Sequence, residues 1–157
     1  MELSEKLANT IEDLTAAEGY ADTFLDAVSL FRAEKQYKHI PLVYDQSICI
    51  SIQGKKFARL NDKTLVYDPS RFLVVPTIIP FDCETESSLE EPFLGINIAI
   101  DYYVVQEIMS ELGEEFSNAS ETMNPQPGIY LESTDGIADP VSRLLECLKT
   151  KGDSAIL

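Results

Sequence analysis

The chain has 157 residues, of which 45% are hydrophobic and 25% are charged, and this composition predicts one globular domain with a real core. Its 27 Asp and Glu residues outnumber 12 Lys and Arg residues, for a net charge of −15, which argues against direct binding of a phosphate backbone. No apolar run approaches the roughly 20 residues of a membrane span, and the acidic start does not resemble a signal peptide, so we expect a cytoplasmic protein that does not contact a membrane.

The first predicted element is an N-terminal helix within residues 1–18. Its apolar residues recur at helical spacing, and Gly19 follows as a stop signal: Leu3, Leu7, Ile11 and Leu14. A first strand is expected at residues 26–32. Residues 35–40 are expected to form a polar loop, which carries the only histidine, His39.

The strongest strand signal lies at Ile48–Gln53. Three isoleucines share one face of this segment, and polar or small residues share the other: Ile48, Ile50 and Ile52 against Ser47, Cys49, Ser51 and Gln53. This period of two, built from β-branched residues and closed by Gly54, is typical of a β-strand. The simplest expectation is that it pairs with residues 57–60 across the turn at Gly54-Lys55-Lys56.

Further short strands follow up to residue 100. Asn61-Asp62 predicts a tight hairpin between residues 57–60 and 65–67, and Asp68-Pro69-Ser70 predicts a β-turn. Three more strands are expected, at Arg71–Val75, Phe81–Ser87 and Phe93–Ile100. Together, residues 26–100 predict a small antiparallel barrel or sandwich.

The period changes to that of a helix after residue 100. Asp101 is a natural N-cap for a helix that ends at Gly113 and carries an apolar stripe: Val104, Val105, Ile108, Met109 and Leu112. A polar loop over 114–127 and a short edge strand at 128–131 are expected next. A second helix is predicted from Asp139, with Pro140 in its first turn and with four apolar residues on one side: Val141, Leu144, Leu145 and Leu148.

Most catalytic and cofactor chemistry finds no motif in the sequence. With one histidine and no His-x-His pair, a mononuclear metal site is not expected. No nucleophile elbow, dinucleotide fingerprint or P-loop occurs, so we expect no cofactor and no enzyme. The acidic runs 84–91 and 111–115 are expected to be solvated rather than to hold calcium. The cysteines Cys49, Cys83 and Cys147 are expected to be buried, reduced thiols, with a redox sensor as the alternative.

A small-molecule pocket is one of two interpretations of the polar strand face. Small β-barrels either fill their interior or hold one ligand, and Cys49, Ser51, Gln53 and Asn97 could line such a pocket. The same face could instead be the solvent side of the sheet or lie under a helix. Arg32 and Tyr44 could anchor an anion or a hydroxyl group, or could be a surface ion pair and a rim aromatic.

The stripe on the second helix also has two interpretations. Such a stripe most often docks on the domain's own sheet. Its narrow width also suits an antiparallel helix pair between two subunits, so Val141, Leu144, Leu145 and Leu148 are candidates for a dimer interface.

Residues 41–101 resemble the N-terminal domain of AraC-type bacterial transcriptional regulators. The likeness rests on the segments Tyr44-Asp45-Gln46-Ser47-Ile48-Cys49, Gln53-Gly54-Lys55-Lys56, Leu60-Asn61-Asp62, Tyr67-Asp68-Pro69-Ser70-Arg71-Phe72-Leu73-Val74-Val75, Pro80, and Pro92-Phe93-Leu94 through Ile100-Asp101. The helix at 139–148 and the final Ser154-Ala155-Ile156-Leu157 are also similar to this family, whose chains continue toward a DNA-binding part. One departure is Asn61 in place of a turn glycine, and asparagine can still adopt a positive φ.

The resemblance implies a mainly β fold: a cupin-like, jelly-roll antiparallel β-barrel followed by C-terminal helices. We therefore expect residues 1–157 to form one regulatory domain, with a helix (1–18), a barrel (26–100) and a helical part (101–157). It would bind an unknown small-molecule effector, form a homodimer, and act on DNA only through a C-terminal helix-turn-helix domain outside this chain. The alternatives are a cupin-like enzyme and an interaction module without a small-molecule ligand.

Overall fold

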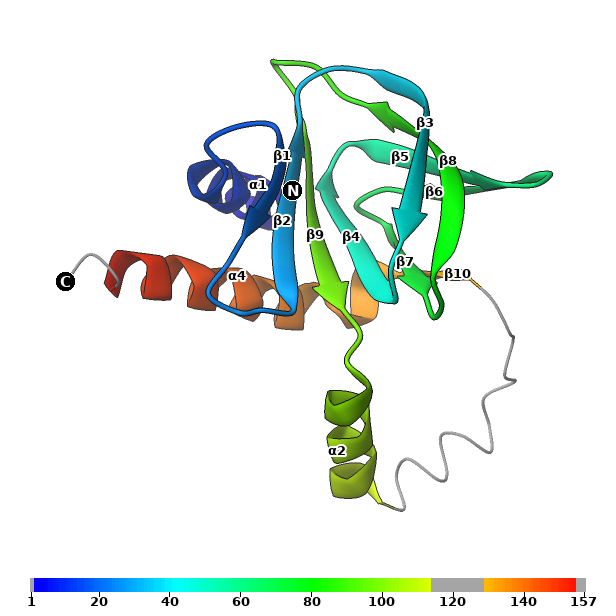
Figure 1. The fold of residues 1–157 in the computed structure, drawn as a ribbon. Helices are drawn as coiled ribbons and strands as arrows, with labels where there is room; N and C mark the ends of the chain where they lie inside the picture. Colours follow the sequence, from blue (N-terminus) through cyan, green and yellow to red (C-terminus); the bar gives the residue numbers. More distant parts are fainter. Residues whose placement is uncertain (1, 114–128, 155–157) are drawn as a thin grey trace.

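The computed structural model describes residues 2–113 and 129–154 as two antiparallel β-sheets with the first and last helices against one of them (Figure 1). The six-stranded sheet has the order β1 (Gly19–Asp22), β2 (Val28–Ala33), β9 (Phe93–Ala99), β4 (Ser47–Gln53), β7 (Arg71–Val75), β10 (Tyr130–Ser133). The four-stranded sheet has the order β3 (Tyr37–Tyr44), β8 (Ile79–Glu86), β5 (Lys55–Leu60), β6 (Lys63–Tyr67). The helices are α1 (Glu2–Leu14), α2 (Tyr102–Leu112), the 3₁₀ turn η1 (Thr134–Gly136) and α4 (Ala138–Ser154).

The expectation of a closed barrel is wrong. The sheets are mainly antiparallel as predicted, but each ends in its own edge strands, β1 and β10 in one and β3 and β6 in the other. No strand within residues 2–113 and 129–154 pairs across the two sheets. The sheets therefore face each other as an open sandwich, and side chains rather than backbone hydrogen bonds connect them.

The pairing expected for β4 is also wrong. Ile48 lies opposite Ile98 on β9 and opposite Val74 on β7, so both edges of β4 are occupied. The chain leaves this sheet at Gly54, whose φ is +91°, and β5 enters the other sheet between β6 and β8. Gly54 is thus a crossing point between sheets rather than a hairpin turn.

Several local predictions are confirmed. β5 and β6 form the hairpin expected at Asn61-Asp62, with Asn61 at φ 56°. Asp68 and Arg71 exchange two backbone hydrogen bonds around the predicted turn. Asp101 caps α2 because its Oδ1 accepts hydrogen bonds from the backbone N–H groups of Tyr103 and Val104. The short edge strand after residue 128 and the helix near Asp139 are also present, as β10 and α4.

The apolar side chains form two clusters, one on each face of the six-stranded sheet. The outer cluster joins α1 and α4 to the sheet, and includes Ile11, Ile50, Leu94, Leu145 and others. The inner cluster lies between the sheets, and includes Cys49, Tyr67, Leu73, Phe81 and Phe93. The predicted two faces of β4 are therefore real, but both are covered: its isoleucine face by the helices, and its polar face by the second sheet.

Several predicted boundaries differ from the structure. The first helix ends at Leu14 rather than at residue 18. The next residue, Thr15, closes the last turn, since its Oγ1 donates a 2.7 Å hydrogen bond to the carbonyl oxygen of Ile11. Gly19 then begins the short strand β1. Residues 37–40, expected in a loop, belong to β3, where a register shift accompanies the positive φ of His39. The predicted loop at 114–127 lies outside the described residues.

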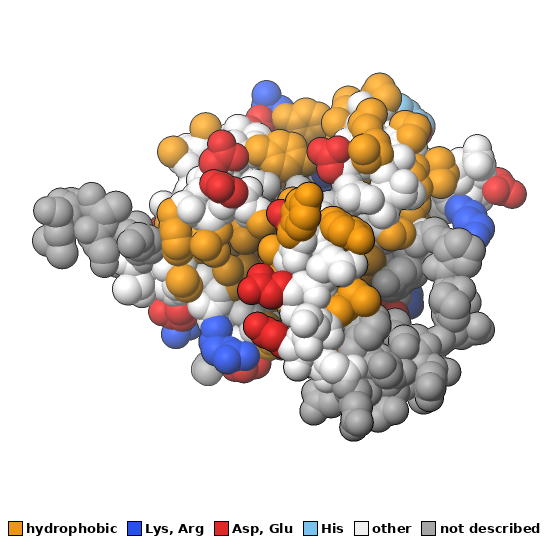
Figure 2. All heavy atoms as spheres, turned by 60° about the horizontal axis from the view of Figure 1, so that its bottom comes forward, with side chains coloured by type: hydrophobic (Ala, Val, Ile, Leu, Met, Phe, Trp, Pro, Cys, Tyr) orange, Lys and Arg blue, Asp and Glu red, His pale blue; other side chains and the backbone are white. Residues whose placement is uncertain are grey.

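Helix α2 stands apart from both sheets (Figure 1). None of its residues is buried, so the predicted apolar stripe of this helix is not covered by the sheets. Figure 2 looks toward this end of the molecule, and orange apolar side chains gather at its surface. The exposed large side chains of α2 are Tyr102, Tyr103, Val104, Val105, Ile108 and Leu112.

Candidate functional site

A pocket of about 360 Å³ opens between the two sheets. Its exposed lining residues, including Asp22, Val43 and Asp45, come from β1 and the end of β3 and define the mouth. Its buried lining residues, including Lys56 and Phe93, define the floor. A second cavity of about 210 Å³ shares lining residues with it, among them Phe31 and Lys56. The volume of the larger pocket, about 360 Å³, falls within the range of small-molecule sites.

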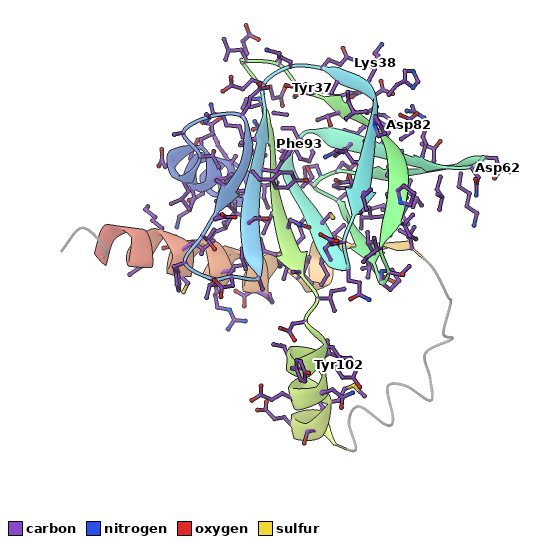
Figure 3. All side chains as sticks on the ribbon, in the orientation of Figure 1. Tyr37, Lys38, Asp62, Asp82, Phe93 and Tyr102 are labelled. Carbon is purple, nitrogen blue, oxygen red and sulfur yellow. The ribbon has the colours of Figure 1, made fainter. Side chains whose placement is uncertain are left out.

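Lys56 is the most unusual residue of the floor. It follows the exposed Lys55 on β5, and because side chains alternate along a strand it points inward. Only 3% of Lys56 is exposed. Its Nζ lies 4.5 Å from the ring centroid of Phe31, 5.7 Å from that of Phe93 and 5.9 Å from that of Tyr44. These rings attract a cation electrostatically, and Phe93 is seen between the sheets in Figure 3.

Hydroxyl and thiol groups lie in the floor of this pocket and, at Cys83, in the lining of the smaller cavity. The hydroxyl groups of Tyr44 and Tyr67 are 3.2 Å apart, and the Cys83 thiol donates to the Tyr44 oxygen at 3.6 Å. The Cys49 thiol donates to Oδ1 of Asn97 at 3.5 Å. Burial raises the pKa values of Cys49 and Cys83, and raises those of Tyr44 and Tyr67 well above 10.0. These groups are therefore neutral at neutral pH, and none supplies a negative charge to Lys56.

The structure brings three of the six predicted pocket residues together. Tyr44, Cys49 and Asn97 all line the 360 Å³ pocket. Ser51 and Gln53 do not line it: Ser51 Oγ donates to the carbonyl oxygen of Gly54 at 2.8 Å, and Gln53 Nε2 donates to that of Pro92 at 2.8 Å. Both side chains hold the backbone where the chain crosses between sheets.

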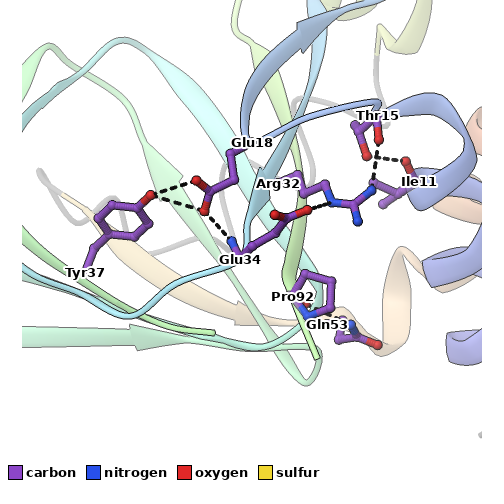
Figure 4. A network of polar contacts seen from close by, with 8 residues as sticks. All are labelled: Ile11, Thr15, Glu18, Arg32, Glu34, Tyr37, Gln53 and Pro92. Atoms are coloured by element: carbon purple, nitrogen blue, oxygen red, sulfur yellow. Dashed lines mark hydrogen bonds and ion pairs between the residues drawn. The ribbon is translucent and has the colours of Figure 1, made fainter. Parts of the chain in front are cut away.

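Arg32 lies at the smaller cavity and in a polar network that holds the N-terminal segment (Figure 4). Its Nη1 donates a hydrogen bond to the carbonyl oxygen of Thr15 at 2.9 Å, and its Nε lies 3.0 Å from Oε1 of Glu34. Glu18 accepts hydrogen bonds from the backbone N–H of Glu34 at 2.6 Å and from the hydroxyl group of Tyr37 at 3.1 Å. The hydrogen bond from the Glu34 backbone is the main cause that lowers the pKa of Glu18. Arg32 is thus held by one hydrogen bond to Thr15 and an ion pair with Glu34, although its Nε forms no hydrogen bond.

The other candidate metal-binding or reactive residues form no further site within the described part of the chain. His39 is exposed and its Nδ1 lies 3.1 Å from Oδ2 of Asp82. Within the described ranges, no group of three or more His, Cys, Asp or Glu side chains could hold a metal ion. Cys49 and Cys83 are buried as predicted, but Cys147 is exposed on α4. No helix in the described part of the chain is long and apolar enough to cross a membrane.

A comparison with protein-family models shows which family the chain belongs to. The model of the AraC-type transcriptional regulator N-terminus matches residues 25–157. The chain belongs to this family. The predicted resemblance is therefore confirmed, and because the family consists of transcriptional regulators, this domain is not an enzyme.

A solved structure shows the same fold for this AraC-type domain. It is similar to ToxT from Vibrio cholerae with a TM-score of 0.53 at 10% sequence identity. The match covers 79% of this chain and 48% of that chain, so the AraC-type domain spans about half the length of ToxT. At this identity the likeness concerns the fold alone. The search of curated proteins found no significant match.

The four residues predicted for a dimer interface of the AraC-type domain lie on α4. Val141, Leu145 and Leu148 are 6% exposed or less and pack within the outer cluster of their own chain. Leu144 is half-buried against the same cluster. The structure thus gives all four a role inside the monomer, and their role in a dimer stays a prediction.

Sequence reasoning missed the aromatic floor and Lys56. The sequence predicts Phe31, Tyr67 and Phe93 only as strand residues. The turn expected at Gly54-Lys55-Lys56 leaves Lys56 outside any strand, whereas β5 begins at Lys55. One signal was available: in Gly54-Lys55-Lys56-Phe57, alternation forces one of two adjacent lysines to face inward. A lysine on the inner face of a strand is rare unless it is paired.

Proposed function

We propose that this AraC-type domain binds a small-molecule effector in the pocket between its sheets. One observation supports the proposal above all: the 360 Å³ pocket has a buried floor that combines aromatic rings with a cation, a thiol and hydroxyl groups. A core that served only packing would be filled by apolar side chains. Small-molecule sites instead combine apolar walls with a few placed polar groups.

The effector would control DNA binding by a helix-turn-helix domain elsewhere in the full-length protein. We propose that residues 1–157 act as one regulatory domain of a cytoplasmic homodimer. The effector must bind one arrangement of the domain better than another, since equal affinity would shift no equilibrium. Residues Glu18 and Arg32 line the smaller cavity and also bond to the segments that follow α1 and β2, so this network is a candidate route from pocket to N-terminal segment.

A thermal-shift screen of the domain against a metabolite library tests effector binding. A ligand at 100 times its dissociation constant stabilises the folded state by about 2.7 kcal/mol. Ser29→Phe, which places a ring in the pocket, should abolish the shift of a true pocket ligand. Thr64→Phe on the exposed edge of β6 is the matched control and should retain it. A flat screen beside a stable dimer would favour an interaction module without a ligand.

The dimer is supported by a separate observation, the exposed apolar side chains of α2. An exposed apolar surface of this kind often marks a protein interaction site. Sedimentation velocity should show a dimer. If Leu144→Glu leaves this dimer intact while Tyr103→Lys with Ile108→Lys dissolves it, the interface lies on α2 and the assignment to α4 is wrong. The opposite result would place the interface on α4.

A further inference from the structure

Lys56 is a buried cation without a negatively charged partner among the described residues. Its side chain contributes no hydrogen bond and no ion pair there, and its Nζ lies near the rings of Phe31, Tyr44 and Phe93. Burial of an ammonium group costs free energy unless the group is paired. The aromatic rings offset part of this cost, but an ammonium group has three N–H donors to satisfy.

No charged group among the described residues around Lys56 serves as its partner. Cys49 and Cys83 are neutral thiols and Tyr67 is a neutral hydroxyl group, because burial raises the pKa of each. The burial of Lys56 likewise lowers its own pKa. The carboxylates of Asp22 and Asp45 line the pocket from its exposed mouth, and neither lies within ion-pair distance of Lys56. The ammonium group therefore faces the pocket with open donor positions.

We propose that the ligand of this pocket is a small organic monoanion, and that Lys56 binds its carboxylate or equivalent group. This inference rests on the proposed effector-binding function and names the ligand class. The ligand's apolar part would lie against Phe31 and Phe93. Asp22 and Asp45 at the mouth would repel a polyanion more strongly than a monoanion, which excludes nucleotides and sugar diphosphates from this class.

The test compares carboxylates with their uncharged amides. The probes are butyrate, hexanoate, octanoate, benzoate and phenylacetate, each with its own primary amide, titrated into the chain by NMR chemical-shift perturbation. At least one carboxylate should bind wild type about tenfold or more tightly than its amide, since a hydrogen bond to a charged group is stronger than one to a neutral group.

Variants of Lys56 and of its neighbour test whether Lys56 causes the preference for carboxylates over amides. Lys56→Met should remove the carboxylate preference, and Lys56→Gln provides a second neutral variant if the first does not fold. Lys55→Met, next to it on the same strand but with its side chain exposed, should keep the preference. Carboxylate preference retained in Lys56→Met and Lys56→Gln would overturn the proposal.

The outcomes separate this inference from the proposed function. Amides that bind in the pocket as tightly as carboxylates would overturn the anion inference and leave effector binding supported. No binding by any carboxylate or amide would overturn the inference and would also count against the pocket as an effector site. The wild-type comparison stands even if neither Lys56 variant folds.

Discussion

The guanidinium Nη1 of Arg32 donates a 2.9 Å hydrogen bond to the carbonyl oxygen of Thr15. Thr15 is 1% exposed and closes the last turn of α1 through its own hydroxyl group. Arg32 lies on β2, so this contact connects the end of α1 to the six-stranded sheet (Figure 4). It is a direct polar link between the end of the N-terminal helix and β2, whose Phe31 lines both cavities.

Loss of this link should destabilise the domain. Arg32→Gln removes a charged donor to a buried carbonyl group and an ion pair with Glu34, so we expect a loss of about 1–3 kcal/mol in the free energy of unfolding. Arg143→Gln is the control, because its ion pair with Asp139 is exposed and should contribute at most about 0.5 kcal/mol. Urea denaturation measures both, and equal losses would show that the link does not hold α1.

Glu18 should make stability depend on pH. Its folded pKa is lowered from 4.5, first by the hydrogen bond from the backbone of Glu34, so its contribution is present above pH 4.5 and is lost as the pH falls through the lower folded value. Glu18→Gln should therefore lower the urea midpoint at pH 7, and the difference from wild type should shrink toward pH 3. A difference that is constant over this range would contradict the role of the carboxylate.

Lys56→Met should stabilise the domain in the absence of ligand. The burial of Lys56 lowers its pKa from 10.5, so the folded state disfavours the charged form, and replacement with a side chain of similar length should gain about 1 kcal/mol. This loss is full below the lowered folded pKa and shrinks as the pH rises from that value toward 10.5, so the difference between the two proteins should be larger near neutral pH than at alkaline pH. Lys55→Met serves as the control. A destabilised Lys56→Met would mean that the aromatic contacts outweigh the cost of burial.

Two glycines with positive φ should respond differently to substitution. Gly54 has a φ of +91°, and an added Cβ would lie 3.0 Å from Cδ2 of Phe93 and 3.2 Å from its Cα. Gly19 has a φ of +104°, but an added Cβ would meet nothing within 4 Å. Gly19→Ala should cost about 1 kcal/mol from backbone strain alone, and Gly54→Ala should cost more. Thermal denaturation compares them; an equal cost would mean that Phe93 moves freely.

The sequence predicted most elements, because their signals are local. The alternation of β4, the hairpin at Asn61-Asp62 and the cap at Asp101 each depend on residues within a few positions of one another. Strand β1 gave no such signal, since Gly19–Asp22 has four residues and pairs only with β2 at the sheet edge. Its existence depends on a partner, not on its own pattern.

The partner of each strand could not be predicted in the same way. Ile48 is followed by a glycine turn that suits a hairpin equally well, yet its neighbours are Ile98 and Val74. Nothing local distinguishes a hairpin at Gly54 from a crossing between sheets. Only a crossing at Gly54 brings Lys56 under the six-stranded sheet, so the sequence did not predict Lys56 in the pocket. Tyr44, Cys49 and Asn97 could be predicted because the pattern of their own strands was enough.

The packing of α1 against α4 has a consequence for synthesis on the ribosome. Ile11 and Leu145 belong to the same cluster, and Lys6 lies 3.6 Å from Glu146, although α1 ends at Leu14 and α4 begins at Ala138. At the usual rate of translation, on the order of ten seconds pass between the synthesis of α1 and the synthesis of α4. The apolar face of α1 is only partly covered by the sheet during that time, so a chain released before Ala138 should aggregate or recruit a chaperone.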